Sequence, residues 1–421
     1  MGVAQVAFVV GSAVSFGGIA AFLSRGEINF MPIVEIHADQ YRVPLETVLT
    51  DSTHGEMSDF GLIVVHLVDE SGRVGLGYTY TPNAIGASAV WKIIESDLAP
   101  LLQHVDPDAI DAIWEKMWWH LHFVGRGGMA SFAMAAVDIA LWDLRGHRES
   151  LALWRLLGGR DPEVPAYAGG IDLYLPTESL LSQAKDFLGQ GFRAIKMKVG
   201  RQQILEDVER VQAMRNLLGP NFPLMADANM GWSIDQAIKA VDALSQFDLY
   251  WLEEPLIPED LEGHERLGRE SRIPIATGER LFTKWDYVDL FPLQAVAMIQ
   301  PDIVQAGGLS ELKKIAAMAE AHYVGFQPHN PYGPICTVAS LHLDACTPNF
   351  LIQEGGLHPW FQDAVNGEFP KQKDGFLPVP EKPGLGISIN EEWVAANPWD
   401  PSANWAPLPG TIAPRQQVAW P

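Results

Sequence analysis

Eight short apolar runs recur between residues 165 and 354, and seven of them end in a charged residue or histidine. The ends of successive runs are about 23 to 29 residues apart, which is the length that one strand, one helix and two short loops need. The stretches between the runs carry apolar residues at helical spacing, for example at 204–217, 233–244 and 310–321. This repeat predicts eight strands that alternate with helices. The runs are 165–170, 194–198, 223–227, 249–253, 273–279, 296–302, 324–329 and 350–354.

Two α/β architectures fit such a repeat, a closed (β/α)8 barrel and a doubly wound open sheet. A doubly wound dinucleotide-binding sheet carries a glycine-rich phosphate loop after its first strand. The first run ends in Gly169-Gly170-Ile171, which does not have the Gly-x-Gly-x-x-Gly spacing. The pattern therefore favours the barrel.

The chain divides into four parts by pattern. Residues 1–30 form an apolar extension with no charge before Arg25, and residues 31–157 alternate strand-like and helical runs, as in an α+β capping domain. The barrel is expected over 158–356, and residues 357–421 are expected to return to the cap and end in a tail rich in proline and tryptophan. The extension lacks the basic start of a signal peptide, so an upstream start or a disordered segment is favoured over a membrane anchor.

Charge and cysteine content narrow the partners and the compartment. The formal net charge of −23 would repel nucleic acid, and no membrane partner is expected. Two cysteines cannot form a disulfide framework, which favours a reducing compartment and a cytoplasmic location. A small molecule is the expected partner.

Asp227, Glu253 and Glu279 end three successive runs. The carboxyl ends of barrel strands converge on one site, so these three carboxylates would repel one another unless a cation lies between them. Oxygen ligands favour a hard ion, and Mg²⁺ is the predicted cofactor. The alternative is that each carboxylate pairs with a neighbouring lysine or arginine, which fits one carboxylate better than three.

Two further sets of polar residues lie at strand ends. Lys196 and Lys198 flank Met197, so strand alternation places both ammonium groups on one face, where each would lower the pKa of the other and produce a base. His329 and Asp302 end neighbouring runs, and a carboxylate beside an imidazole forms an acid–base pair. These residues predict proton transfer next to the metal.

Several motifs together resemble the enolase superfamily, mandelate racemase subgroup, and within it the galactonate- and gluconate-type dehydratases. The resemblance covers about residues 31 to 390 and implies a (β/α)7β TIM-like barrel with an N-terminal α+β capping domain, one Mg²⁺, and commonly a homo-oligomer. One position departs from the galactonate dehydratases, which carry histidine where this chain has Asn229. The motifs are Lys196-Met-Lys198, Met225-Ala-Asp227-Ala-Asn229, Trp251-Leu-Glu253-Glu-Pro, Thr277-Gly-Glu279, Gln300-Pro-Asp302 and Pro328-His329.

The resemblance implies a Mg²⁺-dependent dehydratase of an aldonate or aldarate. Lys198 would remove the α-proton, and Lys196 would keep Lys198 deprotonated. His329 with Asp302 would protonate the leaving β-hydroxyl, giving a 2-keto-3-deoxy acid. A protonated Glu354 would hydrogen-bond the substrate carboxylate.

Asn229 and His54 are the candidate substrate contacts, His54 because it lies in the polar segment 50–58, which could be a lid. Three alternatives remain at this point. A racemase or epimerase of a 2-hydroxy acid would use the same lysine and His–Asp pair. A Schiff-base aldolase would need only a lysine, and a binding protein would keep the metal site without turnover.

Overall fold

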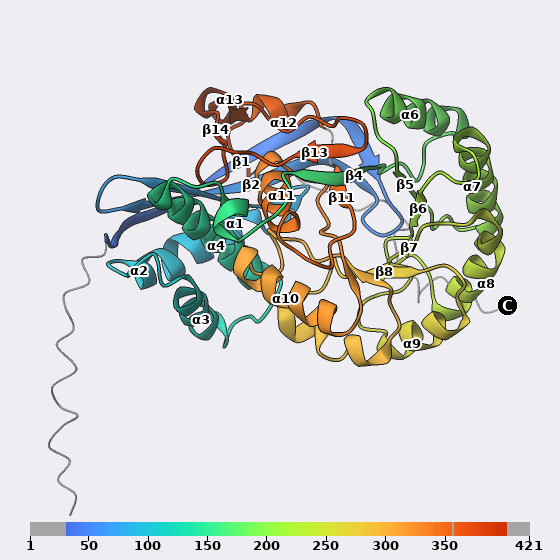
Figure 1. Cartoon of the computed structure of the whole chain (residues 1–421), viewed down its shortest axis with the longest axis horizontal. Coiled ribbons are helices and arrows are strands. Elements are labelled where there is room, and N and C mark those ends of the chain that lie inside the picture. Colours follow the sequence, from blue (N-terminus) through green and yellow to red (C-terminus); the bar gives the residue numbers. More distant parts are fainter. Residues whose placement is uncertain (1–30, 356–357, 402–421) are drawn as a thin grey trace, which may run out of the picture.

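The computed structural model describes residues 31–355 and 358–401 of the 421-residue chain. The predicted extension at 1–30 and most of the predicted tail, 402–421, lie outside the described residues. Within the part that the structure describes, no helix is both long enough and apolar enough to cross a bilayer. A cap and a barrel lie side by side in Figure 1, with the helices α12 and α13 at the top of the view.

The cap is built on an antiparallel sheet of β1 (Ile33–Thr50), β2 (Glu56–Asp69) and β3 (Val74–Pro82). One face of this sheet packs against the long helix α4 (Met129–Glu149), in which Ala136 and Ala140 approach Gly77 of β3 so closely that a Cβ there would clash. The other cap helices are α1 (Ala87–Ile93), α2 (Ala99–Leu102), α3 (Ile110–Leu121) and α5 (Leu153–Leu156), with a π-helical turn at Ile94–Leu98.

The eight barrel strands are parallel and follow the order β10-β9-β8-β7-β6-β5-β4-β11. A parallel bridge between Phe326 and Phe350 links the two ends of this order and closes the barrel. The strands are β4 (Glu163–Gly169), β5 (Ile195–Lys198), β6 (Leu224–Asp227), β7 (Leu252–Glu253), β8 (Ile275–Thr277), β9 (Met298–Ile299), β10 (Gly325–Phe326) and β11 (Gln353–Gly355). The predicted fold class is confirmed.

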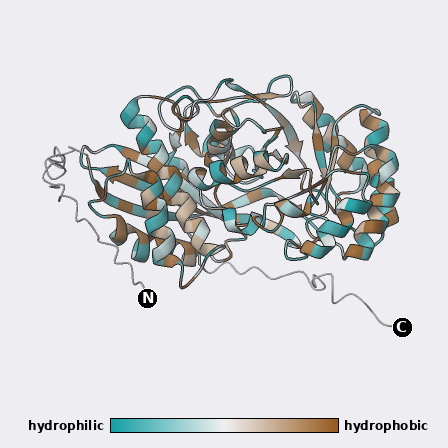
Figure 2. Cartoon of the chain, turned by 60° about the horizontal axis from the view of Figure 1, so that its bottom comes forward, coloured by the Kyte–Doolittle hydropathy of each residue, from teal (hydrophilic) through white to brown (hydrophobic). Residues whose placement is uncertain are grey.

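Helices surround the barrel on the outside (Figure 1), and Figure 2 shows hydrophilic residues alternating with hydrophobic ones along them, as expected for helices with one face on a core. The connection after β8 differs, because it contains 3₁₀ turns at Lys284–Tyr287 and Phe291–Leu293 instead of an α-helix. The helices are α6 (Thr177–Gly189), α7 (Ile204–Leu218), α8 (Ile234–Leu244), α9 (Leu261–Glu270), α10 (Leu309–Ala321) and α11 (Pro334–Asp344).

Strand alternation separates two layers of side chains in the barrel. Ile195, Met197 and Val199 point outward into the core shared with the surrounding helices. A smaller cluster that includes Tyr167, Met225 and Trp251 fills the barrel interior. Lys196 and Lys198 therefore point inward, above this interior layer, as strand alternation predicts.

The chain after β11 runs back across the barrel to the cap. It contains α12 (Trp360–Asp363), β12 (Val365–Asn366), β13 (Phe376–Pro378), β14 (Ser388–Ile389) and α13 (Glu391–Ala395). The strand β13 pairs with β4 of the barrel, whereas the amide of Arg42 in β1 donates to the carbonyl of Asn397 over 3.2 Å. These contacts join the barrel, the C-terminal segment and the cap.

Candidate active site

Asp227, Glu253 and Glu279 meet at the carboxyl ends of β6, β7 and β8. Each of the three buried carboxylates offers an oxygen, and these oxygens lie within 4.8 Å of one another. Asp227 and Glu253 are direct partners in the parallel register of β6 and β7, which is why their side chains converge. An all-oxygen set of three carboxylates with room for further ligands fits Mg²⁺.

The carboxylate of Glu253 is held in place by two neighbours. Its Oε2 accepts a hydrogen bond from Nε1 of Trp251 over 3.0 Å and another from Nε2 of Gln300 over 2.6 Å. Sequence reasoning missed both positioning roles, although both residues flank carboxylates within the recognised motifs. Bonds of this kind fix the orientation of a metal ligand.

Burial and mutual repulsion strain this cluster electrostatically. Burial, followed by the charge of Asp227, raises the pKa of Glu253 to about 8. Burial also raises the pKa values of Asp227 and Glu279, but Lys198 and His329, respectively, are the strongest of the neighbouring cations that hold them below their ordinary values, so ionisation of the cluster depends on nearby positive charge. The donor set and its repulsion together support a divalent cation at this position.

Lys196 and Lys198 supply positive charge to the same carboxylates. Nζ of Lys196 lies 2.5 Å from Oε1 of Glu253, and Lys198 forms an ion pair with Asp227. Burial lowers the pKa of Lys198, but the charges of Asp227, Glu279 and Glu253 together raise it above its ordinary value. Lys196 lowers the pKa of Lys198, as the sequence predicts, but the neighbouring carboxylates outweigh this effect, so the pKa of Lys198 is not lowered overall.

His329 and Asp302 form the predicted pair. Nδ1 of His329 lies 2.8 Å from Oδ2 of Asp302, and Nε2 lies 3.2 Å from Oε2 of Glu279. Burial lowers the pKa of His329, but the charge of Glu279 and the hydrogen bond with Asp302 raise it above its ordinary value. Asp302 also accepts a hydrogen bond from the hydroxyl of Tyr80 over 3.1 Å, which sequence reasoning did not identify.

Glu354 lies beside Lys196, with 2.8 Å between its Oε1 and Nζ of the lysine. Its other oxygen accepts a hydrogen bond from the amide of Asn330 over 3.0 Å. Burial raises the pKa of Glu354, but the charges of Lys196 and His329 hold it below its ordinary value. The protonated form that the resemblance implied is therefore not the form that these contacts favour.

The two candidate substrate contacts come from different domains. Asn229 follows β6, and its buried Oδ1 makes no hydrogen bond within the described residues. His54 lies in the turn between β1 and β2, where its Nδ1 is 2.7 Å from Oδ2 of the buried Asp51. The hydroxyl of Thr53 donates to the carbonyl of Asn229, so this cap loop rests directly on the end of β6.

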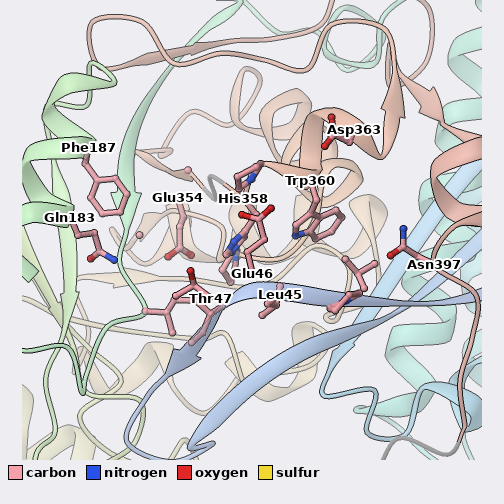
Figure 3. A pocket seen from close by; sticks show the side chains of 18 of the residues that line it. Leu45, Glu46, Thr47, Gln183, Phe187, Glu354, His358, Trp360, Asp363 and Asn397 are labelled. Carbon is pink, nitrogen blue, oxygen red and sulfur yellow. The ribbon is translucent and has the colours of Figure 1, made fainter. Parts of the chain in front are cut away.

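A cavity of about 430 Å³ adjoins the cluster of charged residues at the strand ends, which it meets at Glu354. It lies between residues 43–49 of β1 and the ends of β4 and β11, and the carboxylate of Glu354 points into it beside His358 (Figure 3). Polar side chains from the cap and from the barrel line the cavity, among them Glu46, Thr47 and Gln183. Apolar side chains such as Leu45, Phe187 and Trp360 line it as well, so the lining is mixed.

Two family models match the chain in succession. "Mandelate racemase / muconate lactonizing enzyme, N-terminal domain" matches residues 35–158, and "Enolase C-terminal domain-like" matches residues 179–393. The 3,6-anhydro-alpha-L-galactonate cycloisomerase of Streptomyces coelicolor is 46% identical over 86% of this chain and 98% of its own length. The L-talarate/galactarate dehydratase of Salmonella typhimurium is 33% identical over 83% of this chain and 87% of its own length.

Solved structures give the same result. A structure described as a racemase from Streptomyces coelicolor with bound magnesium is 46% identical and matches with a TM-score of 0.83 over 87% of this chain and 99% of that one. The Salmonella typhimurium dehydratase with Mg and L-lyxarohydroxamate matches with a TM-score of 0.81 at 30% identity, over 91% of this chain and 95% of that one. The chain therefore belongs to the enolase superfamily, in its mandelate racemase and muconate lactonizing enzyme group.

Proposed function

We propose that this protein removes the α-proton of a sugar acid and expels the oxygen substituent of the β-carbon, giving a 2-keto-3-deoxy acid. The observation that carries this proposal is the placement of Lys198 and His329 around one carboxylate cluster. Lys198, on β5, pairs with Asp227, whereas His329, which follows β10, contacts Glu279. A base and an acid on different sides of a bound molecule suit an elimination.

The proposed ligands of Mg²⁺ are Asp227, Glu253 and Glu279, and the ion, when bound, supplies positive charge where the enediolate develops. A dication at the cluster would offset the charge of Asp227, which raises the pKa of Lys198, so Lys198 could then be deprotonated and take the proton from Cα. Lys196 keeps positive charge near the substrate carboxylate. His329 donates a proton to the β-oxygen as the Cβ–O bond breaks. The resulting enol then takes a proton at Cβ and becomes the keto acid.

The leaving oxygen decides which reaction results. In a 3,6-anhydro sugar acid the β-oxygen belongs to a ring, so its expulsion opens the ring and releases no water, which is an isomerisation. The 46% identity to a 3,6-anhydro-alpha-L-galactonate cycloisomerase favours this substrate class. In an open-chain sugar acid the same steps release water.

Dehydration of an aldonate or aldarate is the second candidate. Named dehydratases that are 31% to 33% identical to the chain support it, and so does the dehydratase-like motif set. The site chemistry is the same for both reactions, since they differ only in whether the leaving oxygen stays bonded to the rest of the substrate.

The test is to incubate the enzyme with Mg²⁺ in D₂O, with 3,6-anhydro sugar acids in one set and open-chain aldonates and aldarates in another. A 2-keto-3-deoxy acid that forms only with Mg²⁺ supports the proposal. The set of compounds that gives this product shows whether the leaving oxygen belongs to a ring or to a free hydroxyl group. Deuterium at Cα without keto acid would instead support the racemase alternative. A keto acid formed equally well with EDTA would contradict the proposal.

A further inference from the structure

Three potential metal ligands gather on the cap sheet, away from the barrel. His37 and Asp39 lie two residues apart on β1, so strand alternation places both side chains on the same face. His66 on β2 is the direct partner of His37 in the antiparallel register. Each residue offers one ligand atom, and these atoms all lie within 4.8 Å of one another.

The geometry of these groups is close to that of a coordination site. The two imidazole rings stack, with centroids 4.9 Å apart and planes 14° from parallel, and Nε2 of His37 lies 3.8 Å from Oδ2 of Asp39. Ligand atoms about 2.1 Å from a tetrahedral zinc ion are about 3.4 Å from each other. Because the two rings are nearly parallel, one of them must turn out of the stack before the nitrogens of both can bind the same ion.

Neighbouring carboxylates complete the surroundings. Oε1 of Glu35 lies 3.5 Å from Nδ1 of His37, the ring nitrogen away from Asp39, without a hydrogen bond between them. Glu391, the first residue of α13, acts electrostatically on His66 and on Tyr41, so it faces the same region from the C-terminal segment.

We propose that His37, Asp39 and His66 form a second metal site, which takes a zinc-class transition ion rather than Mg²⁺. Two imidazoles and one carboxylate are a borderline ligand set, typical of Zn²⁺ and unlike the all-oxygen set at the barrel.

The test is Zn²⁺ binding to the full-length protein in excess Mg²⁺, followed by competition with a chromophoric chelator. We expect His66→Gln and His37→Gln each to weaken Zn²⁺ binding by about tenfold or more, because each removes one of three ligands. Glu253→Gln in the barrel cluster and His120→Gln on the exposed part of α3 are the matched controls and should retain the site.

Unfolding temperatures in EDTA establish that the variants fold, and the absorption bands of bound Co²⁺ provide a second readout. We expect Zn²⁺ to raise the unfolding temperature of the wild type and of His120→Gln but not that of His66→Gln. Equal Zn²⁺ affinity in the wild type and in both cluster variants would overturn the proposal. So would loss of the site in Glu253→Gln, or an equal weakening in His120→Gln.

Discussion

Nζ of Lys196 lies 2.5 Å from Oε1 of Glu253, although β6 separates their two strands. The other two clustered carboxylates also have a cationic partner, Lys198 at Asp227 and Arg280 at Glu279, so the alternative in which each carboxylate pairs with a lysine or arginine holds for all three. The ammonium of Lys196 also lies 2.8 Å from Glu354 and 3.7 Å from Asp227. Lys196 is thus the shared counter-ion of the site. It stabilises the carboxylates without a metal, and it repels a dication that binds among them.

Lys196→Met should therefore affect metal binding and catalysis in opposite directions. We expect Mg²⁺ to bind about tenfold more tightly, because a competing charge is gone, while turnover falls by about a hundredfold or more. Calorimetric titration with Mg²⁺ and a keto-acid assay measure the two effects. Weaker Mg²⁺ binding in the variant would show that Lys196 supports the metal site instead of competing with it.

His329→Asn should separate proton abstraction from elimination. The variant retains Lys198 and the carboxylates, so it should still exchange the α-proton with D₂O, whereas keto-acid formation should fall by about 10² to 10⁴. NMR of the substrate and product follows both reactions in one sample. Lys198→Ala is the matched control and should lose both, and normal keto-acid formation by His329→Asn would refute the assignment of the acid.

The barrel and the charged strand ends were predictable because they repeat. In a barrel strand, alternate side chains are buried against the surrounding helices, and polar side chains are expected only where the strand ends. Lys198, Asp227 and His329 therefore stood out in the sequence. The missing helix after β8 could not be predicted in the same way, since 3₁₀ turns leave no regular apolar spacing. The protonation states of Lys198 and Glu354 also depend on distances that no spacing supplies.

Contacts between the cap and the barrel were equally hidden. Asp51 precedes His54 in a polar segment, and nothing in the sequence shows that its carboxylate is buried and accepts from the amides of Thr53 and His54. The role of Tyr80 beside Asp302 required the two domains to be packed together. Residues that contact a site from another domain carry no periodic signal.

Asp51→Asn should loosen the cap loop that carries His54. The loop depends on three bonds to one carboxylate, including the 2.7 Å contact with the imidazole, so the Michaelis constant for the sugar acid should rise about tenfold. The turnover number should change less, because Lys198 and His329 stay in place. His54→Gln keeps the backbone anchors and removes the imidazole, and an unchanged Michaelis constant in that variant would exclude His54 as a substrate contact.

Stability should fall in mild acid because of His342 on α11. Its Nδ1 accepts a hydrogen bond from the amide of Trp154 over 3.2 Å, its Nε2 lies 3.0 Å from the carbonyl of Leu385, and burial lowers its pKa to about 4. Only the neutral ring makes both bonds. A histidine in an unfolded chain has a pKa of about 6.5. Below that pH the unfolded chain therefore binds a proton at His342, whereas the folded chain keeps this ring neutral until the pH approaches about 4.

The free energy of unfolding should therefore decrease as the pH falls from about 6.5 to about 4, by on the order of 3 kcal/mol from this residue. Urea unfolding at a series of pH values measures the decrease. His342→Asn should be less stable at pH 7, because it cannot make both bonds, but its stability should depend less on pH within this window. An identical pH dependence in the wild type and the variant would show that other groups cause the loss.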